Sequence, residues 1–439
     1  MERFFYKILQ VLKPVTPPAL LLPKPPKIFY GWWIVGACFI IAFYTGGVIF
    51  YGFTAVFEPI AQHFRWSYTQ ISFAASLRGL EMGILAPLIG ILVDRWGPRK
   101  LLIGGTIVTT LGLLVLSRTV SLGMFYGAFA LLAVGTSICS TTVFMPAVAN
   151  WFRRKIGLAT GIMVCGYGFS GLLVPLMVRL IDLYGWQAAI AIFAAGMLII
   201  CLPLSLIVRH RPEHYGYQPD GEINNDVRSR DPKAAVEAVE ISVKAKEALK
   251  NRAFWHITLA LLCQTVILMA VITHIMPYLS SIGIPRTKSG LVASVLPLIS
   301  IGGRLGLGWL GDRSDKRRVM AAALAMMGIG ILCFGFASPQ TMPALISFLV
   351  LFGIGYGGIN TLRASILTEL FGRGSFGTIH GATLGIMDLG GIAGPPIAGY
   401  VYDKFGTYQP VWLAFAVLIA IAVALILNTP QVNATKRCS

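Results

Sequence analysis

The sequence predicts an all-α membrane protein with twelve transmembrane helices in two pseudo-symmetric six-helix bundles. Three observations support this fold class. Hydrophobic residues make up 56% of the chain, charged residues 12%, and the mean hydropathy is +0.74, whereas soluble domains carry roughly 25% charged residues. Long apolar segments recur along the chain, and its two halves resemble each other. The 48 glycines suit close packing between helices in lipid.

The apolar segments come in two groups of six. A membrane-spanning helix needs about 20 mostly apolar residues. The predicted spans are 30–55, 68–92, 101–120, 122–150, 156–180, 186–208, 253–279, 287–311, 319–338, 341–369, 376–401 and 408–428. The predicted domains are an N-terminal tail (1–29), an N-terminal bundle (30–208), a linker (209–252), a C-terminal bundle (253–428) and a C-terminal tail (429–439).

The basic residues predict the orientation of the spans. Most of the 36 Lys and Arg lie in the tails, the linker and every second loop, and loops rich in Lys and Arg stay in the cytoplasm. We therefore expect a multi-pass protein of the cell (inner) membrane with both termini cytoplasmic. The net charge of +18 is then topogenic and needs no nucleic-acid partner. Residues 1–29 read either as a disordered tail or as an interfacial amphipathic helix.

Enzyme chemistry has no visible basis in the sequence. The seven cysteines form no CxxC pair, so we expect neither a disulfide framework nor a metal site. There is also no nucleophile elbow, P-loop or metal-ligand cluster. We expect no cofactor and no catalytic residue, and the lipid bilayer is the one structural partner that the composition implies.

An internal repeat relates the two halves. Gly90–Gly97 (GILVDRWG) follows the second span, and Gly308–Arg313 (GWLGDR) follows the eighth. At a nearly constant offset, Gly157, Gly161, Gly171, Pro175, Asp182 and Gly185 recur as Gly377, Gly381, Gly391, Pro395, Asp403 and Gly406. A parallel repeat of this kind predicts a pseudo-two-fold axis along the membrane normal and a binding site at mid-depth between the halves.

Over residues 30–428 the chain resembles a major facilitator superfamily transporter. The resemblance rests on GILVDRWGPRK (residues 90–100) and its weaker copy GWLGDRSDKRR (residues 308–318). It implies cytoplasmic loops that help to set the conformational equilibrium, with Asp94, Arg95, Asp312 and Arg313 as gating residues. Such carboxylates can accept from helix-terminal N–H groups or pair with Arg. Topogenic charge alone is the alternative.

Tyr30–Phe73 is similar to the opening of the monocarboxylate porter and oxalate/formate antiporter branches, and Gly377–Gly406 has a pattern shared more widely in the superfamily. This resemblance implies that Arg304, in the eighth span, binds a carboxylate. A guanidinium in an apolar span is costly and therefore a functional candidate, and it can bind a carboxylate bidentately. A structural ion pair is the alternative.

Asp388 lies in the eleventh span and is expected to neutralise Arg304 or to take up a proton. The oxalate/formate branch carries a Lys at this site, so the acid here favours a monoanion as substrate. Two other positions depart from the animal monocarboxylate transporters. Ser300 stands where they carry an Asp, and the first span contains no Lys.

Other polar residues in the spans are weaker candidates. Arg78 and Glu81 can meet on one helix face, as a self-neutralising pair or in proton coupling. His380 can relay protons near neutral pH or simply be packed. Arg363 shares a stripe with Tyr356 and Asn360, and it either lines the inner vestibule or pairs with Glu369 or a lipid headgroup. Polar aromatic residues that can line the cavity, or only pack, are Tyr51, Tyr126, Tyr167, His274 and Tyr278.

Together these features predict a secondary active transporter that moves a small organic monocarboxylate by alternating access. A proton is the expected coupling ion in a symport mechanism, and a monomer is the expected state. Two alternatives remain open: an organic anion exchanger or carrier of another small solute, and a membrane ligand sensor that transports nothing.

Overall fold

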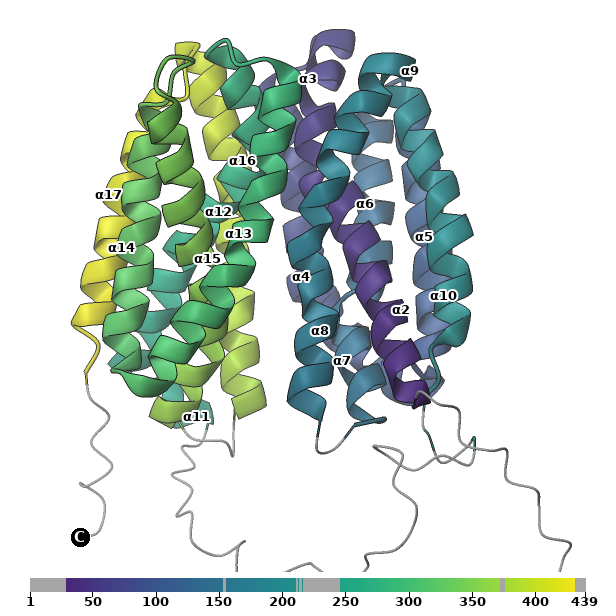
Figure 1. Ribbon diagram of the computed structural model, residues 1–439, viewed down its shortest axis with the longest axis vertical. Coiled ribbons are helices and arrows are strands. Elements are labelled where there is room, and N and C mark those ends of the chain that lie inside the picture. Colours follow the sequence, from purple (N-terminus) through teal and green to yellow (C-terminus); the bar gives the residue numbers. More distant parts are fainter. Residues whose placement is uncertain are drawn as a thin grey trace, which may run out of the picture.

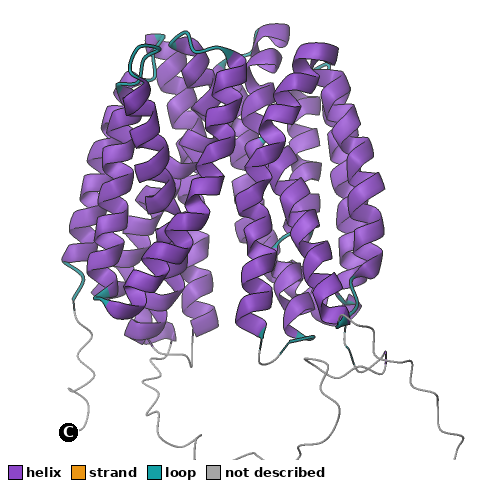
Figure 2. Cartoon of the chain, in the orientation of Figure 1, coloured by secondary structure: helices purple, strands orange, loops and turns teal. Residues whose placement is uncertain are grey.

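A computed structural model shows helices and connecting loops over the part of the chain that it describes (Figure 2). The described residues are 29–152, 155–210, 212, 215, 245–371 and 376–430, without the side chains of residues 78–84, 86, 87, 94, 245, 246, 376 and 377. Backbone groups in a bilayer must be hydrogen-bonded within the protein, and a helix does this within one segment. The apolar composition therefore leads directly to a helical bundle.

The N-terminal half makes six passes. Its helical segments are α2 (Tyr30–Thr45), η1 (Gly46–Tyr51), α3 (Phe53–Phe64), α4 (Tyr68–Trp96), α5 (Pro98–Ser117), α6 (Leu122–Ile138), α7 (Thr141–Ala149), α8 (Ile156–Phe169), η2 (Ser170–Leu172), α9 (Leu173–Gly196), η3 (Met197–Cys201) and α10 (Leu202–Ile207). Several passes are therefore built from more than one segment. The fifth and sixth passes meet at Gly185, whose φ of 82° breaks α9 between them, because only glycine adopts this region easily.

The C-terminal half uses one long helix for each pass. After the short α11 (Ala245–Ala248) come α12 (Arg252–Ser281), α13 (Arg286–Arg313), α14 (Lys316–Gly335), α15 (Met342–Phe371), α16 (Phe376–Phe405) and α17 (Gln409–Leu427). Nine stretches of described residues are long and apolar enough to cross a membrane. One of them, Ile156–Ile207, holds the two passes that meet at Gly185, and α4 and α16 supply the other two. The predicted twelve-helix fold is confirmed.

The first pass is longer than the sequence predicts. It runs to Phe64 rather than to residue 55, and it contains the π-helical turn η1. A π-helical turn accommodates an extra residue without breaking the helix and is frequent at functional sites. The second pass also extends beyond its predicted end, to Trp96. It stops there because Gly97 has a φ of 78° and Pro98 begins the next helix.

The two halves lie side by side and converge at one end (Figure 1). In that view the N-terminal half runs from purple to teal and the C-terminal half from green to yellow. The chain enters the bundle at Tyr30 and leaves it at Leu427 on the same face, which also carries the ends of the segment between the halves. We call this the tail face. Contacts between the halves gather toward the opposite face.

Two acidic residues make contacts across the halves at that opposite face. The Asp403 carboxylate accepts hydrogen bonds from the N–H groups of Tyr68 (2.9 Å) and Thr69 (2.8 Å) and from the Thr69 hydroxyl. Asp182 forms an ion pair with Arg286 (3.4 Å), whose guanidinium also donates to the Ala55 carbonyl (2.6 Å). We call these contacts the Asp403 clamp and the Asp182 clamp.

The seam between the halves continues toward mid-depth. The Met276 N–H donates to the Thr54 hydroxyl (3.1 Å), and the Ser76 hydroxyl donates to the Ile392 carbonyl (2.5 Å). On the other side of the molecule Ile301 of α13 packs against Gly168 of α8. Ile301 and Ile392 therefore mark the depth to which these contacts reach.

Candidate functional site

Arg304 lies near the middle of α13, about 13 Å from the end of the helix at Arg313, given a rise of 1.5 Å per residue. It is one helical turn closer to the tail face than Ile301, which packs against Gly168 across the seam. Two glycines fix its surroundings. A Cβ on Gly303 would meet the carbonyl oxygen of Ile354, and a Cβ on Gly357 would meet that of Ser300. The two glycines thus bring α13 and α15 into backbone contact beside Arg304.

The Arg304 guanidinium has no protein counterion in the described part of the chain. Its Nε atom is buried without a hydrogen-bond partner. The ion pairs between described residues do not include it. Arg304 as a whole is half-buried, and a charge that is partly removed from water without a partner carries a desolvation cost. The site is therefore suited to an anion that enters from outside.

Two tyrosines connect this site to both halves. Tyr51, at the end of η1, interacts through its hydroxyl with Tyr356 of α15 and lies within electrostatic range of Arg304. Both rings are buried, with 6% and 8% of their surface exposed. Tyr51 is the contribution of the N-terminal half, and Arg304 and Tyr356 belong to the C-terminal half. A ligand on Arg304 would therefore lie at the junction of the halves.

Asp388 does not pair with Arg304, and that expectation is wrong. The carboxylate lies about 18 Å into α16 from Phe376, and it interacts electrostatically with Arg363. Nη1 of Arg363 lies 3.7 Å from the Met387 sulfur, next to Asp388 in the chain. The physical reason is the order of the helices: α15 packs against both α13 and α16, so its Arg363 lies closer to Asp388.

The proposed pairing of Arg363 with Glu369 is also contradicted. Glu369 accepts from Lys316 at 2.6 Å, near the tail face. Arg363 instead remains in the site, with its Nε buried and without a partner among the described residues. His380 interacts electrostatically with Arg363. Asn360, on the same stripe of α15, donates to the Tyr356 carbonyl (3.3 Å).

Three of the aromatic candidates lie outside this cluster. His274 is fully buried, and its ring nitrogens contact the Tyr408 hydroxyl (2.9 Å), the Pro395 carbonyl (2.9 Å) and the Ser72 hydroxyl (3.0 Å). Tyr278 donates to the Phe334 carbonyl (2.6 Å) and Tyr126 to the Gln70 carbonyl (2.9 Å). For all three, the sequence left open whether they line the cavity or only pack. Each is satisfied by protein groups nearer the opposite face, which agrees with packing.

Tyr167, the remaining aromatic candidate, packs inside the N-terminal half. Its ring lies against Gly46 at the start of η1, inside the N-terminal half, and its hydroxyl interacts with the backbone of Thr141. It therefore supports the first pass, on the same π-helical turn whose other end carries Tyr51.

The expected gating and proton-coupling residues are described only in part. The side chains of Arg78, Glu81 and Asp94 lie outside the described residues. Arg95, Asp312 and Arg313 are exposed at the tail face. Arg313 covers the Trp309 ring, with its Cζ 4.1 Å from the ring centroid. The ion pairs between described residues include none of these three, so their role as locks stays a prediction.

The sequence did not assign Tyr356 and Arg363 to the site together. Their spacing with Asn360 along one helical stripe was the available signal, because residues three, four and seven apart share a helix face. Which residues that stripe would face depends on how α15 packs between its neighbours, and no local pattern records this. Among the described residues no group of three His, Cys, Asp or Glu is arranged to hold a metal.

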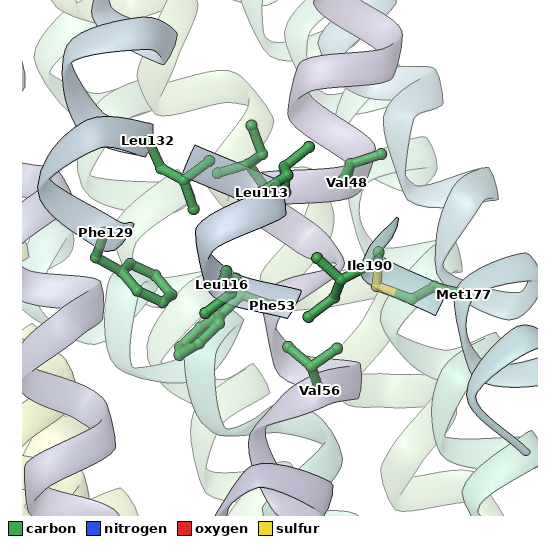
Figure 3. Close-up of a pocket in the computed structure, with 10 residues that line it drawn as sticks. Val48, Phe53, Val56, Leu113, Leu116, Phe129, Leu132, Met177 and Ile190 are labelled. Carbon is green, nitrogen blue, oxygen red and sulfur yellow. The ribbon is translucent and has the colours of Figure 1, made fainter. Parts of the chain in front are cut away.

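A separate small cavity lies inside the N-terminal half (Figure 3). Its volume is about 20 Å³, and the side chains that line it are all apolar. They are Val48, Ile49, Phe53, Val56, Leu113, Leu116, Phe129, Leu132, Met177 and Ile190. With no polar or charged side chain in its wall, this cavity is unsuited to an anion and is distinct from the Arg304 cluster.

The fold and the mid-depth site define the class of protein. The Major Facilitator Superfamily profile matches residues 32–395 and, in a second overlapping match, 275–437. The chain belongs to this superfamily and is a multi-pass membrane transporter, a class without enzymatic activity. A solved bacterial homolog of the human lysosomal transporter Spinster, in an inward-facing and occupied conformation, has the same fold. Its TM-score is 0.69 at 17% identity, covering 92% of this chain and 97% of that one.

Relatives indicate the branch within the superfamily. The chain is 25% identical to mouse monocarboxylate transporter 12 over 417 residues, which cover 89% of this chain and 84% of the relative. It is 24% identical to human monocarboxylate transporter 2 over 431 residues, covering 94% of this chain and 88% of the relative. The resemblance to the monocarboxylate porter branch is confirmed.

Proposed function

We propose that the protein is a secondary active transporter of a small organic monocarboxylate. The observation that carries the proposal is the half-buried Arg304, whose Nε atom is buried without a partner and which has no counterion among the described residues. A carboxylate can accept two parallel hydrogen bonds from such a group, and the buried tyrosines beside it supply hydroxyl groups and apolar ring surface. The names of the relatives point to the same class of substrate.

Alternating access is the proposed mechanism. The two clamps and the seam hold the halves together from the face opposite the tails to the level of Ile301. Arg304 lies just beyond that level, toward the tail face. The described conformation thus corresponds to one end state, in which the site communicates with the tail face. Rocking of the halves around the site would expose it to the other side.

The membrane context belongs to the same proposal. We place the protein in the cell (inner) membrane as a monomer, with residues 1–29, 209–252 and 429–439 in the cytoplasm, in agreement with their basic residues. The tail face would then be the cytoplasmic face. The substrate would enter or leave the site from the cytoplasm in this state.

Proton symport is the proposed coupling mode, with Asp388 as the first candidate for proton uptake. Arg363 is the charged group that acts on it in the described part of the chain, and His380 and Tyr356 in turn act on Arg363. Glu81, Arg78 and His380 are the other candidates. An Asp388→Asn variant should lose proton-driven accumulation yet keep exchange of labelled substrate. Accumulation at the wild-type level would move the coupling role to Glu81 or remove it.

The central experiment tests Arg304 in proteoliposomes. Arg304→Gln and Arg304→Lys should abolish or strongly reduce uptake of labelled monocarboxylates, because neither side chain offers two parallel N–H donors from a fixed plane. Expression, monodispersity and melting temperature of the purified variants serve as folding controls. Uptake at the wild-type rate by both variants would refute the assignment. Counterflow without internal pH change in the wild-type protein would identify an exchanger rather than a symporter.

A further inference from the structure

The cluster around Arg304 contains more positive than negative charge. Arg304 and Arg363 contribute two guanidinium groups and Asp388 one carboxylate, while Tyr51, Tyr356 and Asn360 are neutral. Counted over Arg304, Arg363 and Asp388, the described site carries one net positive charge. A monocarboxylate would therefore balance the site, and a dicarboxylate would leave it one negative charge in excess.

Arg363 resembles Arg304 in the hydrogen bonding of its guanidinium as well as in its charge. Its Nε atom is also buried without a hydrogen-bond partner among the described residues, and its Nη1 atom makes a weak contact with the Met387 sulfur. Asp388 lies close enough to act on it electrostatically. No ion pair within 4.0 Å joins the two described side chains, however. Asp388 thus balances the charge of Arg363 and leaves its N–H donors available.

We infer, on the basis of the function proposed above, that Arg363 is a second anion-binding residue and that Asp388 acts as a built-in anion which restricts the site to singly charged carboxylates. Arg304 binds the substrate carboxylate. The far end of the substrate meets Arg363 and Asp388 together. While Asp388 is ionised, an uncharged end is accepted there, and a second carboxylate is rejected by Asp388.

Coulomb repulsion is the physical basis of this selectivity. Two like charges a few ångströms apart repel strongly where the effective dielectric constant is about 20 rather than 80. A like-charge contact of this kind is an effective way to reject a competing ligand. If the charge of Asp388 is removed, the two guanidinium groups of the cluster remain, and each can bind one carboxylate of a dicarboxylate. The substitution should then reverse the preference instead of weakening binding in general.

The test compares butyrate with succinate, which have the same number of carbon atoms and differ in one carboxylate. Binding to the purified full-length protein is measured by thermal shift at neutral pH, and uptake is measured in proteoliposomes. Wild-type protein should respond to butyrate and not to succinate. Asp388→Asn should shift the ratio of apparent affinities at least tenfold toward succinate.

Three further variants separate the inference from general effects. The double variant Asp388→Asn/Arg363→Gln should lose the gained response to succinate, because the second guanidinium is gone. Asp388→Glu keeps the charge and should keep the preference for butyrate. Glu369→Gln removes a carboxylate from the same helix as Arg363, at its Lys316 pair outside the site, and should leave the preference unchanged.

The outcomes are decisive in either direction. An Asp388→Asn protein that still rejects succinate, or a double variant that still accepts it, overturns the inference while the role of Arg304 stands. Wild-type protein that responds to no carboxylate overturns the proposed function, and the inference with it. If Asp388→Asn is unstable because Arg363 has lost its counter-charge, succinate in the solubilisation buffer should restore a monodisperse protein. Restoration by butyrate alone, or by neither, counts against the second subsite.

Discussion

At the scale of single residues, the site depends on close backbone contact as much as on charge. Arg304 takes its position because Gly303 and Gly357 let α13 and α15 touch. The same contact sets where Tyr356 and Arg363 project from α15. A side chain at either glycine would push the helices apart, and the cluster would widen. The glycines therefore contribute to substrate recognition without touching the substrate.

Gly357→Ala tests this role. The new methyl group would meet the Ser300 carbonyl oxygen and lie 3.0 Å from the backbone nitrogen of Arg304. Overpacking of this kind costs typically 1–3 kcal/mol of stability. We expect a lower melting temperature and a higher KM for the carboxylate in uptake assays. Gly306→Ala is the matched control on α13, since its Cβ would meet nothing within 4 Å. Equal effects of the two substitutions would contradict the prediction.

The hydroxyl contact between Tyr51 and Tyr356 supports a second residue-scale prediction. A hydrogen bond contributes about 0.5–1.5 kcal/mol net, which corresponds to a change of roughly two- to tenfold in an equilibrium constant. Tyr356→Phe removes both this contact and a hydroxyl group of the site, and it should raise KM for the carboxylate by a few-fold. The same assay on Tyr278→Phe serves as the comparison, because that hydroxyl binds Phe334 away from the site. A larger KM effect at Tyr278 would refute the assignment of Tyr356.

At the scale of elements, the fifth and eighth passes form one close part of the seam. Gly168 of α8 faces Ile301, and Gly171 of η2 faces Pro297 and the Ser294 carbonyl of α13. The 3-10 turn η2 also contacts η1, which ends at Tyr51 in the site. One irregular turn thus touches both the seam and the helix that supplies Tyr51 to the cluster.

Gly168→Leu should favour the state in which this seam is open. The closed seam has no room for the leucine side chain, because its Cβ alone would lie 2.5 Å from Ile301. A mutation shifts a conformational equilibrium only if it makes different contacts in the two states, and this clash occurs only in the closed state. Hydrogen exchange in residues 286–301 should become faster. Gly157→Ala, on the same helix with open space around its Cβ, is the control. If hydrogen exchange in residues 286–301 is unchanged in the Leu variant, the contact between Gly168 and Ile301 does not favour the closed state.

At the scale of the whole molecule, the two clamps are related by the internal repeat. Asp182 and Asp403 occupy corresponding positions in the halves, and each reaches the beginning of a helix in the other half: Asp182 to α13 through Arg286, Asp403 to α4 through Tyr68 and Thr69. The chemistry has diverged. One clamp is an ion pair, and the other places a carboxylate at a helix N-terminus, where N–H groups lack intrahelical partners.

The two clamps should differ in strength and in salt dependence. The Asp182 side chain is 47% exposed, and exposed ion pairs contribute at most about 1 kcal/mol and weaken with salt. Asp403 accepts three hydrogen bonds, two of them from the helix backbone. Asp403→Ala should therefore open the face opposite the tails more than Asp182→Ala, as measured by distances between spin labels at the ends of the halves. Equal shifts for the two variants in low salt would contradict this ranking.

The chain itself determines most of the architecture. Apolar segments of sufficient length must become helices in a bilayer, because no other structure satisfies their backbone groups there, and the repeat predicts the two halves. Arg304 was recognisable because a guanidinium in an apolar span is costly. These inferences follow from local composition and spacing, so they can be made without knowing how the helices pack.

Tertiary packing decided which charges meet. The sequence paired Arg304 with Asp388, whereas the placement of α15 gives Asp388 to Arg363 and leaves Arg304 without a counterion. It also moved His274, Tyr126 and Tyr278 out of the cavity, into hydrogen bonds nearer the opposite face. A helix sequence records which residues share a face, but not the neighbour toward which that face turns. That choice depends on close helix contacts such as Gly357 against Ser300, between residues far apart in the chain.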